Sequence, residues 1–200
     1  MYKNGFIPFL IKIQFFLISQ LCFSKQINLR KIISSNEITL TISGTGDQKI
    51  LSDTKCLEDF IFEQLPGKIL VNGVSQDIIG YTVYNLIQEI NNVTMIWYSS
   101  ITNCNCMFSG LTNIISIDFS KFDTSQVSNM LYMFNDCHSL TSLDLTSFNI
   151  EKVTDMRKMF FGCINLQKVE QNFRAPLAFD ITSMFDLCWS LQSIDLSNWG

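Results

Sequence analysis

The chain has 200 residues, of which 14 are basic and 18 acidic, so its formal net charge is −4. An apolar content of 47% is enough for one domain with a hydrophobic core. Because the chain is mildly acidic and has no basic run, we expect no binding to nucleic acid. One histidine and no Cys-x-x-Cys pair argue against a metal site, and no motif indicates a cofactor.

Residues 1–24 have the pattern of a secretory signal peptide. Lys3 gives a basic start, an apolar run follows from residue 6 to 21, and small residues stand at positions −3 and −1 of a cleavage site after Ser24. We therefore expect a secreted or cell-surface protein. An uncleaved signal anchor is the alternative, although Lys12 inside the run weakens it as a membrane span of about 20 apolar residues.

Residues 25–105 are predicted to form a small β-rich N-terminal cap. Apolar and polar residues alternate over 38–42, and two further apolar stretches are predicted as strands. Leucine and isoleucine four residues apart predict a short helix, ended by Pro66-Gly67. The predicted elements are strands at 38–42, 68–73 and 93–98 and a helix at 56–65. The Asn92-Val93-Thr94 sequence is an N-glycosylation sequon, with Asn92 as the acceptor.

Six cysteines remain once the signal peptide is removed, and an even count in a secreted chain favours disulfides. Cys104 and Cys106 adjoin the cap, and a bridge from one of them to Cys56 is open. The other three cysteines occupy the place that Leu111 fills in the first repeat, so we interpret them as buried free thiols. They are Cys137, Cys163 and Cys188. Bridges between neighbouring repeats would also be geometrically allowed.

A 26-residue repeat organises the rest of the chain, residues 106–200. A Met-Phe pair recurs at offsets of 26, 26 and 25 residues, at Met107, Met133, Met159 and Met184. A fixed period of 20–50 residues is the signature of stacked repeats. Apolar residues follow each Met at constant spacings, and an acidic residue stands at the end of each repeated pattern. These acids are Asp118, Asp144, Glu170 and Asp195.

Each repeat unit is predicted to be a short strand followed by a short helix. Leu140-x-x-Leu143-x-Leu145-x-x-Phe148 follows the leucine-rich pattern, and its alternation indicates a strand. Val153, Met156, Met159 and Phe160 would share one helical stripe. The predicted fold class is an α/β repeat, a leucine-rich-repeat-like solenoid of parallel strands and helices with about 3.5 units, the last truncated.

These units resemble the 26-residue bacterial-surface-protein repeat of the BspA-like leucine-rich family, in its expanded protist form. The resemblance is carried by Met133-Phe134-x-x-Cys137-x-Ser139-Leu140-Thr141-Ser142-Leu143-Asp144-Leu145 and by Val153-Thr154-x-Met156. It implies a surface-displayed binding or adhesion module, without catalytic residues to transfer. We expect further repeats or a membrane anchor beyond Gly200, since the last unit stops before its helix.

The candidate ligand-binding surface is the predicted concave face, where outward residues alternate with the core. It comprises Ser116, Asp118, Ser142, Asp144, Thr146, Glu170, Ser193 and Asp195. Stacking would align the acids into a column facing a protein or glycan ligand. The alternative is a solvated polar face that binds no ligand. A second functional hypothesis is a structural coat protein that self-associates through its stack.

No enzymatic function is expected from the sequence. His138 stands beside Cys137, but adjacent residues normally point in different directions, and Ile164 and Trp189 occupy the matching places of His138. A Cys-His pair needs hydrogen-bond contact between the two side chains. We therefore interpret His138 as a surface-turn residue.

Overall fold

The computed structural model describes residues 36–53, 64–77, 79–171, 174, 177 and 180–195. The chain divides into two compact units, 1–34 and 35–200, and every described residue belongs to the second. The predicted signal peptide lies outside the described residues, as does nearly all of the helix predicted at 56–65.

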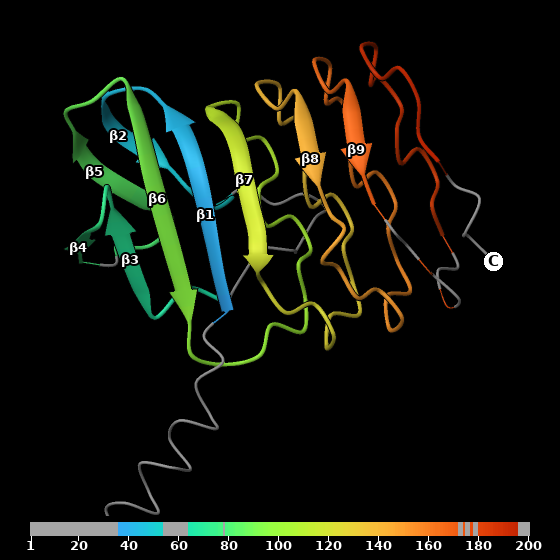
Figure 1. Ribbon diagram of the computed structural model, residues 1–200, viewed down its shortest axis with the longest axis horizontal. Coiled ribbons are helices and arrows are strands. Elements are labelled where there is room, and N and C mark those ends of the chain that lie inside the picture. The colour runs from blue at the N-terminus through green and yellow to red at the C-terminus, as the bar shows by residue number, and fades with distance from the viewer. Residues whose placement is uncertain are drawn as a thin grey trace, which may run out of the picture. The chain divides into compact units, whose positions relative to one another are not determined.

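Five strands form an antiparallel sheet in the order β4-β3-β6-β1-β7 (Figure 1). They are β1 (Asn36–Ser43), β3 (Lys68–Val71), β4 (Val74–Gln76), β6 (Ile90–Trp97) and β7 (Ile114–Lys121). The strands predicted near 38–42, 68–73 and 93–98 are thus confirmed as β1, β3 and β6. Two short pairs complete the described strands: β2 (Gly46–Lys49) with β5 (Thr82–Leu86), and β8 (Ser142–Asp144) with β9 (Lys168–Glu170).

Strict alternation gives the five-stranded sheet one buried and one open face. Ile38, Leu40 and Ile42 of β1 are fully buried, whereas the residues between them are half-buried. Strand β7 is the first strand of the repeat region, yet it pairs antiparallel with β1, with Thr39 opposite Asp118. The N-terminal region and the first repeat therefore share one sheet.

The predicted α/β solenoid, with a helix in each unit, is wrong. The part of the chain that the structure describes contains no helix and is built from strands and turns, with a largely antiparallel sheet at its N-terminal side. Repeat units do lie side by side, and β8 and β9 pair in parallel (Figure 1). Parallel bridges also join the start of each Met-Phe segment to the next, in the series Asn103, Asn129, Asp155 and Asp180.

Hydrogen bonding explains why the Met-Phe segments are not helical. Alternate amides bond in two directions: Met133 N donates to Met130 O within its unit at 3.2 Å, whereas Phe134 N donates to Met159 O of the next unit at 2.8 Å. An α-helix directs its amides to carbonyls four residues back along the same chain. Here half of them leave the unit, so each segment is a run of turns that depends on its neighbour.

The same places in successive units hold left-handed backbone conformations. One series is Cys106, Tyr132, Lys158 and Ser183, with φ from 53° to 61°, and the other is Gly110, Asp136, Gly162 and Leu187, with φ from 55° to 74°. Positive φ costs an L-residue roughly 1–2 kcal/mol and interrupts a right-handed helix. The apolar spacing that suggested a helical stripe therefore arises from turns, which also place apolar side chains inward.

A column of stacked rings forms the centre of the repeat core. The ring centroids of Phe108 and Phe134 are 5.9 Å apart, those of Phe134 and Phe160 5.4 Å, and those of Phe160 and Phe185 5.2 Å. Phe108, Phe134 and Phe160 are fully buried. Such pairs contribute roughly 0.5–1.5 kcal/mol each beyond the burial of their apolar area. The one ring per unit therefore links the units into a continuous core.

The N-terminal region covers the first unit through the same kind of bond that joins repeats. Ser52 N donates to Met107 O at 3.0 Å, and the equivalent carbonyl of the next unit, Met133 O, accepts from Phe108 N at 2.9 Å. Ile50 and Leu51, next to Ser52, are fully buried. The segment 50–52 thus stands where a preceding unit would stand.

We expect Gly162→Ala to destabilise the fold more than Gly110→Ala. Both glycines have φ near +74°, so each substitution should cost about 1 kcal/mol of backbone strain. A Cβ at Gly110 would meet open space, whereas one at Gly162 would collide with the Asp136 carboxylate of the preceding unit. Chemical denaturation should show Gly162→Ala to be less stable than Gly110→Ala, because the Asp136 carboxylate must move away from the added methyl group. Equal losses would contradict this packing of neighbouring units.

Candidate functional site

The structure places all eight predicted ligand-binding residues at exposed positions on the strand side of the repeats. Ser116 and Asp118 lie on β7, Ser142 and Asp144 on β8, and Glu170 on β9. Thr146 follows β8, and Ser193 bridges in parallel to Lys168 of β9. The parallel register sets Asp144 opposite Glu170. These eight residues, with the β7–β9 strands that carry them, are called the strand face below.

Two hollows lie on the strand face. The smaller, about 110 Å³, is lined by Ile117, Asp118, Phe119, Ser120, Asp144, Thr146 and Ser147. The larger, about 380 Å³, is lined by Thr146, Lys168, Val169, Glu170, Gln171, Ser193, Ile194 and Asp195. Six of the eight predicted residues line one hollow or the other, and Ser116 and Ser142 line neither. Thr146 belongs to both hollows.

The two aspartates of the face also close the turn that follows their own strand. Asp118 Oδ1 accepts from Ser120 N at 2.8 Å, and Asp144 Oδ1 accepts from Thr146 N at 2.9 Å and from Thr146 Oγ1 at 2.6 Å. These hydrogen bonds lower the pKa of both carboxyl groups. The largest effect comes from the Ser120 amide for Asp118 and from the Thr146 hydroxyl for Asp144. Both carboxylates are therefore ionised at neutral pH, and their role in closing turns was not predicted from the sequence.

Cations partly compensate the column of acids. Lys168 Nζ lies 2.5 Å from Glu170 Oε1 within β9, and Lys121 Nζ lies 3.0 Å from Glu37 Oε2 across the β1–β7 pair. Both pairs are solvent-exposed, so each contributes no more than about 1 kcal/mol to stability. The face therefore presents mixed charges and hydroxyls around a net acidic column.

The open face of the N-terminal sheet extends the strand face. Opposite residues of an antiparallel pair share a face, and the register sets Thr41 opposite both Ser116 and Asn92. The Thr41 hydroxyl donates to Asn92 Oδ1 at 3.2 Å. Asn92, the predicted glycosylation acceptor, is exposed on β6. A glycan attached to Asn92 would therefore stand on the same open surface, two strands away from β7.

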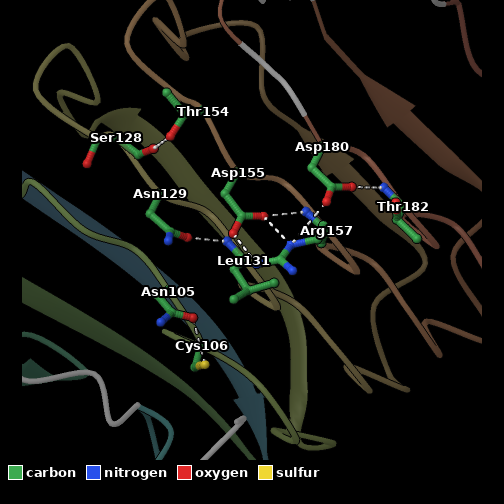
Figure 2. Close-up of polar contacts among 10 residues, drawn as sticks. All are labelled: Asn105, Cys106, Ser128, Asn129, Leu131, Thr154, Asp155, Arg157, Asp180 and Thr182. Atoms are coloured by element: carbon green, nitrogen blue, oxygen red, sulfur yellow. Dashed lines mark hydrogen bonds and ion pairs between the residues drawn. The ribbon is translucent and has the colours of Figure 1, made fainter. Parts of the chain in front are cut away.

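A second polar column runs along the turn side of the repeats, and Figure 2 shows three of its four members, Asn129, Asp155 and Asp180. Its members are Asn103, Asn129, Asp155 and Asp180, each four residues before a Met of the Met-Phe pairs. Each accepts a hydrogen bond through Oδ1 from the amide two residues later, at 2.8–3.1 Å. The fixed place of Asn or Asp before each Met was the signal that sequence reasoning missed. The role of this column is to close the turns.

Charged and aromatic side chains also lie on the turn side of the repeats. Arg157 lies 2.7 Å from Asp155 and 3.5 Å from Asp180, contacts that raise its pKa (Figure 2). Lys158 Nζ lies 5.4 Å from the ring centroid of Tyr132 and 5.3 Å from that of Phe161. A hollow of about 240 Å³ is lined by Leu131, Tyr132, Arg157, Lys158 and Thr182. These contacts connect side chains of the second, third and fourth units.

The repeated cysteines form a third column, inside the core. The thiols of Cys137, Cys163 and Cys188 donate to the carbonyls of Phe108, Phe134 and Phe160 in the preceding unit, at 3.0–3.1 Å. All three are free, as predicted. The first unit has no preceding repeat to offer this carbonyl, which explains why Leu111 can fill the place.

The cysteines next to the N-terminal region differ from each other. Cys106 is disulfide-bonded, and Cys104 is a buried free thiol. Cys56, a possible bridge partner in the sequence, lies outside the described residues. His138 Nε2 lies 3.6 Å from Asp136 Oδ1, while the neighbouring Cys137 thiol points to the Phe108 carbonyl.

Within residues 36–53, 64–77, 79–171 and 180–195, no group of three or more His, Cys, Asp or Glu side chains is arranged to hold a metal ion. In the same part of the chain, we find no helix that could span a membrane.

Alkylation by iodoacetamide at pH 8 should distinguish the thiols by burial. Burial raises the pKa of Cys188 to about 11, that of Cys163 to about 12 and that of Cys137 well above its usual range. The thiolate is the reactive form and Cys188 is only half-buried, so Cys188 should be modified before Cys163 and Cys137. Peptide mass mapping over time measures the order, with urea-unfolded chain as the control. Equal rates for Cys137 and Cys188 in the folded chain would contradict the core column.

Acid should weaken the turns that the aspartates close. A carboxylate whose folded pKa is lowered contributes stability above its unfolded pKa of about 3.9. That contribution is lost as pH falls through the lowered folded pKa. Asp144→Asn cannot titrate, so its melting temperature should fall less between pH 5 and pH 2.5 than that of the unaltered chain. Asp77→Asn, an exposed acid outside these turns, is the control. An unchanged pH dependence in Asp144→Asn would refute the assignment.

Comparisons with known proteins give one informative match. The model of a family described as "Mycoplasma protein of unknown function, DUF285" matches residues 81–199, more than half of the chain. No curated protein and no solved structure matches the chain. The matched residues begin immediately before β5 of the β2–β5 pair and extend through the repeats. The chain therefore belongs to the DUF285 family of Mycoplasma proteins of unknown function.

Proposed function

We propose that the chain is a recognition module that binds a protein or glycan ligand through the strand face. The observation that carries the proposal is the pair of hollows, which gather Asp118, Asp144 and Thr146 in one and Thr146, Glu170 and Asp195 in the other. Carboxylates, hydroxyls and an amide there offer both donors and acceptors to a polar ligand. Concave faces of repeat stacks commonly serve as binding surfaces.

The chemistry of the face favours ligands with hydroxyl or cationic groups. Asp118 and Asp144 each use Oδ1 for their own turn, which holds the carboxylate in a fixed orientation at the surface. Hydrogen bonds that such carboxylates accept are about twice as strong as those between neutral groups. Lys168 beside Glu170 adds a donor in the larger hollow. This arrangement suits sugar hydroxyls and the basic side chains of a protein partner.

The resemblance to BspA-like surface repeats and the signal-peptide pattern of residues 1–24 support the same proposal. Together they favour a secreted or cell-surface protein that acts in adhesion or recognition. The exposed sequon at Asn92 fits passage through a secretory pathway.

The proposal is tested with a double variant that changes charge but keeps the fold. Asp144→Asn with Glu170→Gln retains an oxygen acceptor at both places, so the turn bond from Thr146 N can persist. Binding is measured on an array of defined neutral and acidic glycans and, for basic protein surfaces, with immobilised poly-L-lysine. The probe that the unaltered chain binds should be bound about tenfold more weakly by the double variant, a loss of about 1.4 kcal/mol.

Asp123→Asn with Glu151→Gln is the matched control. Both acids are exposed, and Asp123 Oδ1 closes a turn to Ser125 N at 2.9 Å in the same way as Asp144 does. Neither residue lines a hollow of the strand face. Equal weakening in both double variants, or full binding by the Asp144/Glu170 variant, would exclude the strand face as the ligand surface.

A further inference from the structure

The hollow on the turn side is bordered by side chains of three consecutive repeat units. Leu131 and Tyr132 belong to the second unit, Arg157 and Lys158 to the third, and Thr182 to the fourth. Its volume of about 240 Å³ is below the roughly 300–1,000 Å³ that is usual for sites of drug-sized ligands. The hollow therefore has room for one small group, such as a single side chain or a single sugar ring.

Lys158 provides a cation that no carboxylate neutralises. Its Nζ lies 5.4 Å from the ring centroid of Tyr132 and 5.3 Å from that of Phe161, and these two cation–π contacts hold the ammonium group in place. Within the described part of the chain, Lys158 forms no ion pair, whereas Lys121 and Lys168 do. The ammonium group of Lys158 is thus oriented by rings and available to an external anion.

The other polar side chains at the hollow also present donors. Arg157 donates through Nε and Nη2 to the Asp155 carboxylate, which fixes the plane of the guanidinium group (Figure 2). Its Nη1 has no acceptor among the described residues. The hydroxyl groups of Tyr132 and Thr182 likewise have no hydrogen-bond partner in the part of the chain that the structure describes. Two cations and two hydroxyl groups can therefore all donate to a ligand.

The carboxylates near the hollow are already occupied. Asp155 Oδ1 accepts from Arg157 N and Nε, and its Oδ2 accepts from Nη2. Asp180 Oδ1 accepts from Thr182 N at 2.9 Å, and its Oδ2 lies 3.5 Å from Arg157 Nε. Two acids and two bases make the neighbourhood neutral, so short-range contacts must hold a ligand here. A matching ligand carries acceptor oxygens, and an anionic group suits Lys158 best.

The wall of the hollow is mainly apolar. Leu131 and the ring of Tyr132 contribute to it, together with the aliphatic stems of Arg157 and Lys158. An acidic side chain of a peptide would bring an anion but only one or two CH2 groups to cover this wall. A sugar ring has a face of C–H groups that would remove the wall from water, and it also carries hydroxyl oxygens. The combination of wall and donors therefore favours an acidic sugar.

We propose that the turn-side hollow binds one unit of an acidic polysaccharide, a sugar ring that carries a carboxylate or a sulfate. The anionic group pairs with Lys158 Nζ and accepts from Arg157 Nη1. The ring packs against Leu131 and Tyr132, and a ring hydroxyl accepts from Thr182. This site is separate from the strand face, whose column of acids would repel the same ligand. The chain thus has two binding surfaces of opposite chemistry.

The experiment uses the full chain and isothermal titration calorimetry with four defined probes. Hexagalacturonate carries carboxylates, a heparin hexasaccharide carries sulfates, maltohexaose is a neutral sugar, and hexa-L-glutamate is an acidic peptide. At least one of the two acidic sugars should bind with a Kd below about 1 mM, and the better of the two identifies the anionic group. Maltohexaose and hexa-L-glutamate should each bind at least about tenfold more weakly than that sugar.

Lys158→Met removes the ammonium group and keeps a flexible apolar side chain over the two rings. It should weaken binding of the acidic sugar about tenfold, which corresponds to about 1.4 kcal/mol. Lys152→Met is the matched control. Lys152 is an exposed lysine of the same unit, its Nζ donates to Gln126 Oε1 at 2.7 Å, and it does not line the hollow. This variant should keep the Kd of the unaltered chain within about twofold.

NMR of the unaltered chain tests the location without any substitution. Addition of the acidic sugar should shift the amide signals of Tyr132, Lys158 and Thr182 and leave those of Ser142 and Asp144 on the strand face unchanged. The opposite pattern of shifts would overturn the proposal. So would equal losses in the two lysine variants, equal affinity for hexa-L-glutamate, or no binding of either acidic sugar at about 10 mM.

The double variant Asp144→Asn with Glu170→Gln separates this site from the strand face. It should bind the acidic sugar as tightly as the unaltered chain does, because neither residue lines the turn-side hollow. A weakened affinity in this variant would place the sugar on the strand face and overturn the turn-side site.

Discussion

The hydrogen bonds that alternate amides send to the next repeat unit are the interaction on which the rest of the structure depends. Each inter-unit bond contributes only about 1 kcal/mol net, because water would otherwise satisfy the same groups. Their direction matters more than their strength. A segment that directs half of its amides to its neighbour cannot form a helix, because a helix needs those amides for its own carbonyls. The units therefore fold as a stack and not one by one.

The side-chain columns follow from this backbone arrangement. The stacking of successive units places Phe on Phe and, from the second unit on, a thiol on the carbonyl of the preceding unit. Within each unit, an Asn or Asp at the same place accepts from the amide two residues later. The N-terminal sheet begins the series by two means. Ser52 supplies the first ladder bond, and β1 pairs with β7 so that the first repeat strand is the edge of a five-stranded sheet. The open face of that sheet then continues into the strand face.

In the strand face, the same residues close turns and line the surface of the proposed ligand-binding site. Asp118 and Asp144 close the turns after their strands, and that bond fixes the carboxylates which line the hollows. An acid that recurs in each unit because it stabilises a turn therefore also recurs at the surface. The acid in step with the repeat is explained by turn closure for these two residues, whereas Glu170 pairs with Lys168 instead. The proposed binding function therefore depends on the hollows and not on the periodicity of the acids.

The sequence by itself determined the period of the repeat, the inward residues, the free cysteines in the core and the exposed positions of the strand face. These follow from spacing, because a side chain that recurs in step with apolar residues occupies the same place in each unit. The secondary structure of the Met-Phe segments could not be read in the same way. Val153, Met156, Met159 and Phe160 have a spacing that suits a helix and also suits consecutive turns. Which of the two forms depends on where the amides find their acceptors, and those acceptors lie about 25 residues away in the next unit. The tertiary structure alone decided this, together with the antiparallel pairing of β7, because both depend on bonds between segments that are distant in sequence.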